Sequence, residues 1–403
     1  MALTKIEVPE LFDFGSDNSA FKLPTGTTAE RPTSPSNGEM RFNTTTGFVE
    51  YYDTTNAQWW EIDYYVPPVV PSDNFNTVLY TGNSSTQNIT GVGFAPDFVW
   101  IKRRNSAEDH AIYDSVRGIN KQLSSNTIAG EATNSSPYEG LNSFDSDGFT
   151  SGNNGGTNRS PNTYVAWSWK AGGAAVSNTD GTITSQVSAN TAAGFSIISY
   201  TGNSTAGATV GHNLNAIPEI VIVKTLNSSN NWAVYNKTIG NTKRLSLDES
   251  NGASSSRIEW NNTTPTSSVI TFGNYSAVNT NQNYIAYAWT SISGYSSIGS
   301  YIGNGSSTGP IVDTGFTPRF VMIKSVSSDD TGGGAWIMYD SARSTSNPRD
   351  KRLFANFDVA EATSSSYNLD FLTGATKGFQ PKDGANYYGY NTLNVEYIYM
   401  AFA

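Results

Sequence analysis

The chain of 403 residues contains no cysteine and only two histidines. Without cysteine there can be no disulfides, thiol catalysis or thiolate metal sites. No stretch approaches the ~20 consecutive apolar residues that a membrane-spanning helix needs, and the first residues lack the apolar run of a signal peptide. We therefore predict a protein that is made in the cytoplasm and does not insert into a membrane.

Charge is also scarce. Charged residues make up 14% of the chain, against roughly 25% in ordinary globular proteins. The net charge of −10 provides no basic field for phosphate groups, which excludes nucleic acid as a partner. Asn, Ser, Thr and Gly supply the polarity instead, and aromatics reach 12%. This composition favours a β-rich, turn-rich fold of the kind found in extracellular proteins.

One stretch occurs three times, each time running from a proline to a lysine six residues later: 96–102, 218–224 and 318–324. A Tyr-x-Gly-Asn motif precedes each copy, and an aromatic strand closes it. We align the closing strands at Tyr164, Tyr284 and Tyr399. The copies are 122 and then 100 residues apart, far longer than solenoid periods, so they predict three whole domains in series.

The resulting prediction is an all-β chain with a short N-terminal module followed by three tandem β-sandwiches, jelly-roll or lectin-like. The predicted boundaries are 1–73 for an extended segment with a β-hairpin, then 74–175, 190–292 and 293–403 for the sandwiches.

The apolar runs at 98–101 and 220–223 are expected to be central strands, buried on both sides. The joint between the first two domains is long and the next one is tight. We therefore expect the first domain to swing while the second and third are rigidly coupled. A short helix is expected near 359–362.

The N-terminal module begins with a polar, proline-punctuated stretch at 25–38 that should run extended. Alternating apolar residues at 39–43 and 48–52 flank a turn and predict a β-hairpin, followed by an aromatic strand at 59–62. Such a short hairpin is marginal in water unless it packs on a partner or on other copies. A homotrimer is therefore predicted, because cyclic assembly would pack the hairpins.

The same module resembles a short segment widespread in fibre and virion proteins of tailed phages. The resemblance covers residues 31–62, and Thr54 replaces the glycine usual after Tyr52-Asp53. Its motif residues are Arg31-Pro32, Pro35, Gly38-Glu39-Met40-Arg41-Phe42-Asn43 and Trp59-Trp60-Glu61-Ile62.

The three repeats resemble an uncharacterised β-domain of marine phage structural proteins, including those of cyanophages. The runs that carry this second resemblance are 98–102, 113–118, 143–149 and 167–173. The third repeat echoes the Asp-Ser-x-x-Arg of the first at Asp340 to Arg343, whereas the second has Asn236-Lys237 instead.

These resemblances imply a virion protein of the phage tail, a tail fibre or adhesin made in the host cytoplasm. Its implied partners are other tail proteins and a host-surface glycan or protein. The residues expected to serve virion anchoring and assembly are Arg41, Phe42, Tyr51, Tyr52, Trp59 and Trp60.

No catalytic residue, metal site or cofactor is predicted. His110 and His212 lack a nucleophile elbow or a metal-spaced partner and are expected to be ordinary surface histidines. The run 145–148 is interpreted as a turn capped by aspartate, with a calcium loop as the alternative. Three repeated lysines are expected to end their strands and reach solvent: Lys102, Lys224 and Lys324.

Most tryptophans lie in strand-like runs and are expected in the core. Trp260 and the loop 386–391 differ, because they place aromatics among Asn and Gly, as sugar-stacking and protein-contact surfaces do. The predicted binding residues are Trp260, Tyr387, Tyr388 and Tyr390.

Two alternatives to an adhesin stay open. A capsid or tail decoration protein would use the same domains without touching a receptor. A polysaccharide depolymerase would need two acids facing one groove, and the acids of this chain are sparse and scattered.

Overall fold

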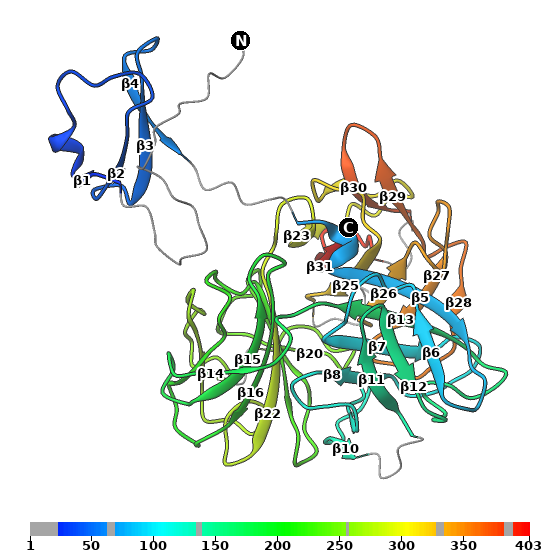
Figure 1. Ribbon diagram of the computed structural model, residues 1–403. Helices are drawn as coiled ribbons and strands as arrows, with labels where there is room; N and C mark the ends of the chain where they lie inside the picture. The colour runs from blue at the N-terminus through cyan, green and yellow to red at the C-terminus, as the bar shows by residue number, and fades with distance from the viewer. Residues whose placement is uncertain (1–22, 63–68, 134–138, 255–257, 328–333, 383–389) are drawn as a thin grey trace. The chain divides into compact units, whose positions relative to one another are not determined.

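The computed structural model describes residues 23–62, 69–133, 139–254, 258–327, 334–382 and 390–403. Within them the chain is all-β, which confirms the predicted fold class, and its helical turns are η1 (Thr28–Glu30) and η2 (Pro71–Asp73) (Figure 1). No helix in the described part is long and apolar enough to cross a membrane. The chain forms two compact units, Met1–Pro67 and Pro68–Ala403. We call the second unit the head.

The first unit is a four-stranded sheet in the order β1-β2-β3-β4. β1 pairs in parallel with β2, and the other pairs are antiparallel. The predicted hairpin is confirmed as β2 and β3, turning at Gly47 with φ of 78°, and the predicted aromatic strand is β4. The strands are β1 (Thr25–Gly26), β2 (Met40–Asn43), β3 (Phe48–Asp53) and β4 (Gln58–Ile62).

Each repeat of the head is a sandwich of an antiparallel main sheet and a smaller second sheet. In the first repeat the main sheet is β5 (Phe75–Thr81), β13 (Thr163–Trp169), β7 (Phe98–Arg103) and β8 (Ala111–Asp114). Its second sheet is β11 (Leu141–Asp145), β12 (Gly148–Ser151) and β6 (Gln87–Thr90), and β9 (Lys121–Gln122) pairs with β10 (Ala132–Thr133).

The second repeat has the widest main sheet of the three. In spatial order it is β14 (Val176–Asn178), β15 (Ser185–Asn190), β16 (Phe195–Thr201), β22 (Asn283–Trp289), β18 (Ile220–Thr225), β19 (Ala233–Asn236) and β20 (Leu245–Ser246). Its second sheet is β17 (Ala208–Gly211) with β21 (Val269–Phe272).

The third repeat follows the same plan. Its main sheet is β23 (Ser296–Ile302), β31 (Glu396–Phe402), β25 (Phe320–Ser325), β26 (Ile337–Asp340), β27 (Lys351–Phe354) and β28 (Ala362–Thr363). Its second sheet is β24 (Val312–Asp313), β30 (Lys377–Pro381) and β29 (Leu369–Thr373). The predicted helix near 359–362 is wrong, because residues 359–361 have no regular secondary structure and Ala362 begins β28.

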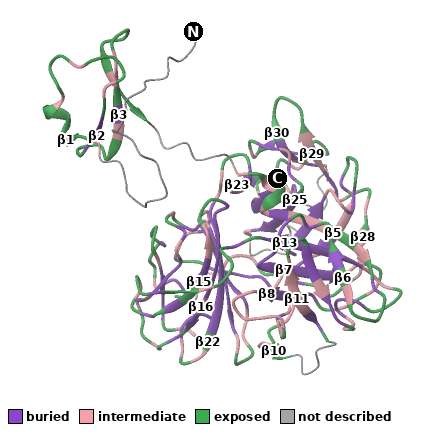
Figure 2. Cartoon of the chain, in the orientation of Figure 1, coloured by how far each residue is buried: buried purple, intermediate pink, exposed green. Residues whose placement is uncertain are grey.

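Both faces of the central strands of the main sheets are buried, as Figure 2 shows along β7, β16 and β22. In β7, Val99 and Ile101 belong to the core of their own sandwich, whereas Phe98 and Trp100 belong to a larger shared core. The shared core takes buried residues from all three repeats. The prediction of central strands buried on both sides is therefore confirmed, and the layer on the second side consists of the neighbouring repeats.

The register shows where the third copy truly aligns. Trp100, Ile222 and Met322 stand four residues after their prolines, and they pair with Trp167, Tyr287 and Met400. The equivalent of Tyr164 and Tyr284 is therefore Tyr397, two residues before the position chosen from sequence. The mistake arose because Tyr397 and Tyr399 both lie in one aromatic strand.

Three equivalent main-chain hydrogen bonds join the repeats into a closed ring. Each repeat contains a Lys-x-Leu triplet, at 121–123, 243–245 and 351–353. The donor of each bond is the N–H of the residue eight positions after the leucine of one triplet. The acceptor is the carbonyl of the residue two positions after the repeated lysine of another repeat. They are Glu131 N–H to Leu226 O (2.8 Å), Ala253 N–H to Val326 O (3.0 Å) and Glu361 N–H to Arg104 O (2.7 Å). Because each repeat bonds to both others, the expectation that the first domain swings is wrong.

Candidate functional site

The three repeated lysines are not at the surface. Lys102, Lys224 and Lys324 are fully buried, which overturns the expectation that they reach solvent. Lys324 Nζ donates to Ser250 O of the second repeat at 2.8 Å, and Lys224 Nζ donates to Ile128 O of the first at 2.7 Å. These ammonium groups bond main-chain carbonyls across the joints of the ring.

Burial changes the protonation of these lysines, because it disfavours a charged ammonium. It lowers the pKa of Lys324 to about 7 and the pKa of Lys224 to about 8. The pKa of Lys102 also falls to about 8, through burial first and the nearby Arg103 charge second.

Both histidines are buried as well, so the expectation of surface histidines is wrong. Trp100 Nε1–H donates to His110 Nδ1 at 2.8 Å. His110 Nε2 therefore carries the hydrogen and donates to Phe354 O of the third repeat at 2.9 Å. Burial lowers the pKa of His110 to about 3, so the ring stays neutral at physiological pH. His212 Nε2 lies 3.2 Å from Thr266 O.

The same donor position recurs around the ring. His110 immediately precedes β8 in the first repeat. At the equivalent positions, Trp232 precedes β19 in the second repeat and Trp336 precedes β26 in the third. Trp232 Nε1–H donates to Ser124 O at 3.0 Å, and Trp336 Nε1–H donates to Ser246 O at 2.8 Å. Each repeat thus donates one ring N–H to the equivalent carbonyl of another repeat, so the histidine has a structural role.

The Asp-Ser-x-x-Arg motif also serves the joints. Asp340 and Arg343 form a fully buried ion pair, and Asp340 Oδ2 accepts Trp167 Nε1–H from the first repeat at 3.0 Å. In the first repeat, Asp114 pairs with Arg117 and accepts the Tyr287 hydroxyl of the second repeat at 2.7 Å.

The second repeat lacks this motif, and the third repeat lacks the side-chain donor that would bond to it. Asn236 replaces the aspartate, and Met400, which has no donor, occupies the strand position of Trp167 and Tyr287. Among the described residues, the Asn236 Nδ2 is buried without a hydrogen-bond partner. The joint between the second and third repeats therefore lacks the charged pair that the other two joints contain.

The two predicted binding aromatics that the structure describes, Trp260 and Tyr390, are buried. Trp260 is 1% exposed and packs edge-on against Tyr235 with ring centroids 5.6 Å apart, so the expectation of an exposed stacking residue is wrong. Tyr390 is 3% exposed and belongs to the core of the third sandwich. Tyr387 and Tyr388 lie outside the described residues. In this conformation neither Trp260 nor Tyr390 can stack on a ligand in solvent.

The predicted anchoring residues divide between the two faces of the small sheet. Arg41 faces inward, donating to Glu30 O at 2.7 Å and lying 3.4 Å from Glu50. Tyr52 and Trp59 share that face, with ring centroids 5.4 Å apart. The other three face the opposite side, and they are Phe42, Tyr51 and Trp60.

Glu50 is the centre of the inward face and is fully buried. It accepts Arg31 Nη2–H at 2.5 Å and Asn43 Nδ2–H at 3.1 Å. Burial would raise the pKa of Glu50, but the hydrogen bonds from Arg31 and Asn43 lower it below its usual value. A buried ionic network, closed by the segment 25–31, takes the place of an apolar core in this unit.

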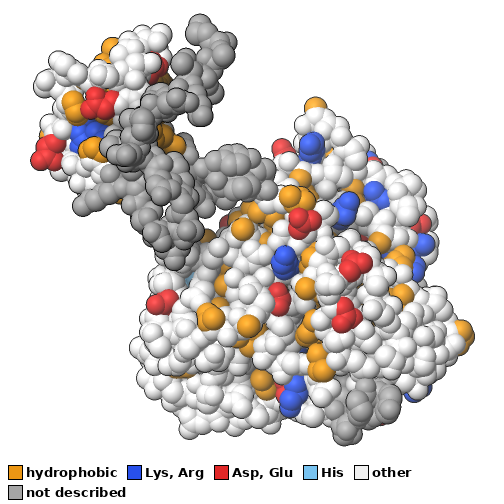
Figure 3. Space-filling model, viewed as in Figure 1, with side chains coloured by type: hydrophobic (Ala, Val, Ile, Leu, Met, Phe, Trp, Pro, Cys, Tyr) orange, Lys and Arg blue, Asp and Glu red, His pale blue; other side chains and the backbone are white. Residues whose placement is uncertain are grey.

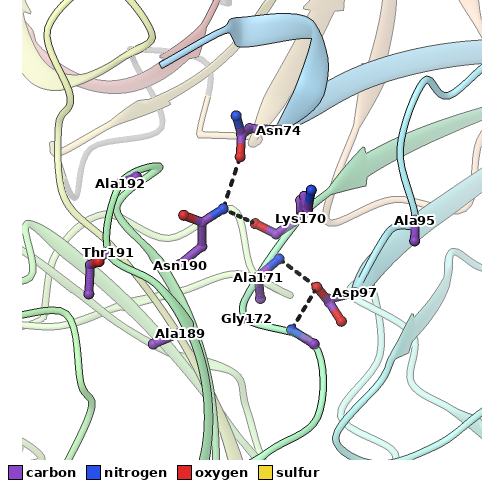
Figure 4. Close-up of a pocket in the computed structure, with 11 residues that line it drawn as sticks. Asn74, Ala95, Asp97, Lys170, Ala171, Gly172, Ala189, Asn190, Thr191 and Ala192 are labelled. Atoms are coloured by element: carbon purple, nitrogen blue, oxygen red, sulfur yellow. Dashed lines mark hydrogen bonds between the residues drawn. The ribbon is translucent and has the colours of Figure 1, made fainter. Parts of the chain in front are cut away.

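The head carries a cleft of about 610 Å³ where the first repeat leads into the second (Figure 4). Asp97 Oδ2 accepts the Ala171 N–H at 2.8 Å and the Gly173 N–H at 3.2 Å. Asn190 Nδ2–H donates to Asn74 Oδ1 at 2.9 Å. The lining is completed by small residues and an exposed lysine, and consists of Asn74, Ala95, Asp97, Lys170, Ala171, Gly172, Gly173, Ala189, Asn190, Thr191 and Ala192.

Small and polar residues line this cleft. Its one acidic side chain, Asp97, is occupied by two main-chain N–H groups, and glycoside hydrolysis needs two acids. Elsewhere, Asp147 accepts the Gly93 N–H at 2.6 Å and the Gly91 N–H at 3.1 Å, so it caps the turn after β6. Among the described residues, no group of three or more His, Cys, Asp or Glu side chains could hold a metal ion.

Sequence reasoning missed a landmark that organises the joints. A Lys-x-Leu triplet recurs at 121–123, 243–245 and 351–353, and its leucine enters the shared core in every repeat. The spacing could have been found in the sequence, because the leucine of the triplet lies nine residues after Asp114 in the first repeat and nine after Asn236 in the second. A four-residue lengthening in the third copy obscured it.

The comparisons with known proteins give a family and no activity. Residues 70–403 match the model of a family described as a domain of unknown function, DUF7483, and the chain therefore belongs to this family. No curated protein and no solved structure matches the chain.

Proposed function

We propose that this member of the DUF7483 family is a non-enzymatic structural protein of a tailed-phage virion, a tail fibre or adhesin. Residues 23–62 would attach the protein to the tail, and the head would contact the host surface. The observation that carries the proposal is the contrast between the two units. The small sheet leaves a mostly apolar face exposed, whereas the head directs His110, Lys224, Lys324 and its Asp–Arg pairs into its own joints.

The proposed mechanism is adsorption through weak, repeated contacts. A closed ring of three related domains is a rigid carrier, and several copies on one particle would convert weak contacts into avidity. The cleft beside Asn190 is a candidate subsite for a host glycan, because Lys170 and Thr191 are exposed at its rim. On the face of the head seen in Figure 3, uncharged polar groups and backbone predominate, and acids and bases are interspersed.

A decoration protein without receptor binding is the second candidate. The burial of Trp260 and Tyr390 favours it, since both were expected to contact the receptor. A depolymerase is the weaker alternative, because the described cleft contains a single acid.

The test has two stages. Purified virions are first probed with an antibody against the head, and absence of the protein from the particle would contradict every virion role. The full-length protein is then incubated with host cells before phage is added. Dose-dependent loss of phage attachment is expected for an adhesin. Binding to virions without any effect on attachment would favour decoration, and release of reducing sugar from the host polysaccharide would favour the depolymerase.

A further inference from the structure

One face of the small sheet is mostly apolar, with the paired Asp53 and Gln58 at one end of it. Met40, Tyr51 and Trp60 pair in a row across β2, β3 and β4, and Phe42, Val49 and Ile62 form the next row on the same side. Four of the six are substantially exposed: Met40 42%, Tyr51 37%, Trp60 43% and Ile62 41%. We call these six residues the apolar face.

The opposite face needs no further cover. Arg31, Arg41 and Asn43 surround the buried Glu50 there, and the chain segment 25–31 closes over them. None of the described residues of this unit belongs to a hydrophobic cluster. A sheet with one apolar face gains its stability by burying that face against another layer. This sheet is therefore one layer of an unfinished sandwich.

We propose that the missing layer is the same face of a further copy of this chain. The inference rests on the proposed function, for which it identifies the surface that assembles the protein into oligomers. None of the six residues is charged. Asp53, the carboxylate at the end of this face, accepts hydrogen bonds from Thr55 N–H and Asn56 Nδ2–H of its own turn, so the centres of two identical faces can meet without like-charge repulsion. Tyr51 and Trp60 lie side by side at its centre, and aromatic residues of this kind dominate the energetics of interfaces.

The head contains the same arrangement within a single chain. Its three main sheets each turn an apolar face toward equivalent sheets in the shared core. Among the described residues the small sheet occurs once, so an equivalent layer for it would come from another molecule. The exposed part of the apolar face is on the order of 400 Å² per copy, because large apolar side chains carry roughly 150–250 Å² each. That is below the roughly 800 Å² per partner of a standard interface. The association is consequently weak and concentration-dependent.

The experiment measures the mass of the full-length protein by analytical ultracentrifugation across a wide range of concentrations. The expected result is a shift from monomer to oligomer as concentration rises. Trp60→Glu places a carboxylate on the apolar face and is expected to raise the midpoint concentration about tenfold or more. Thr55→Glu adds the same charge in the exposed turn between β3 and β4 and is expected to leave the midpoint unchanged.

Cross-linking keeps the inference testable if Trp60→Glu unfolds the sheet. Because the chain has no cysteine, a single introduced thiol reports only on its own position. Tyr51→Cys is expected to yield covalent dimers with a short bismaleimide, since facing sheets pack ~10 Å apart, too far for a disulfide. Thr55→Cys is the matched control and should remain monomeric.

Three results would overturn the inference. They are a monomer at every concentration, equal cross-linking of Tyr51→Cys and Thr55→Cys, and an oligomer that forms only after removal of residues 1–22. The last would mean that the chain covers the face itself. These measurements need no host cell, so a monomer that still blocks phage attachment would contradict this inference alone. An oligomer that fails to block attachment would contradict the adhesin alone.

Discussion

The small sheet and the head solve the same folding problem in opposite ways. The small sheet buries an ionic network around Glu50 and exposes its apolar face. The head buries apolar residues on both faces of the central strands of its main sheets and places buried ion pairs such as Asp340–Arg343 at the joints between repeats. The head is complete as one chain because three copies of a sheet cover one another. The small sheet, present once, remains one layer.

The largest expected difference is in the stability lost when a tryptophan is removed from each unit. Trp260→Ala is expected to destabilise the head by about 4 kcal/mol, because it leaves a large cavity in the core of the second sandwich. Trp60→Ala should change the free energy of unfolding by less than about 0.5 kcal/mol in dilute solution, because Trp60 is exposed there. Denaturant unfolding of both variants measures the contrast. Equal costs would mean that Trp60 is already covered in the monomer.

The next prediction tests the ionic core of the small sheet. Glu50→Ala should destabilise that unit by about 3 kcal/mol, since it leaves the buried Arg41 and the half-buried Arg31 without their counter-charge. Glu61 pairs directly opposite Glu50 but is exposed, so Glu61→Ala is the matched control, expected to cost well under about 1 kcal/mol. Hydrogen exchange resolved by peptide would show whether β2 and β3 lose protection while the head keeps its own.

The buried lysines predict a pH dependence of the head. The folded-state pKa of Lys324 is lowered to about 7, well below that of an unfolded lysine, so between these values the unfolded chain binds more protons. Stability should therefore rise by on the order of 1–2 kcal/mol from about pH 7 to about pH 9. Lys324→Met should remove part of this rise. An unchanged slope of unfolding free energy against pH would contradict the assignment.

The smallest expected effect tests the equivalence of the joints. Trp336→Phe deletes the Nε1–H that bonds Ser246 O and should cost about 1 kcal/mol. Trp232→Phe removes the equivalent bond to Ser124 O and should cost the same. Thermal unfolding of the two variants makes the comparison. A much larger loss for one of them would show that the joints differ in strength.

Much of the fold could be predicted because it depends on local pattern. Runs such as 98–101 are apolar without alternation, which marks strands buried on both sides. The hairpin at β2 and β3 followed from its alternation and its glycine turn. The candidate site was harder to predict. Trp260 is followed by Asn261 and Asn262 in the sequence, yet the fold turns its ring inward against Tyr235 and Phe272.

The sequence by itself determined that the chain is all-β, that it contains three copies of one domain, and that a separate hairpin module precedes these copies. Only the tertiary structure decided that the repeats close into a ring, with Lys324 and His110 buried at its joints. The reason is physical. Strand pairing and turns follow from residues close in the chain, whereas the burial of a lysine or a tryptophan depends on which surface, a hundred or more residues away, comes to cover it.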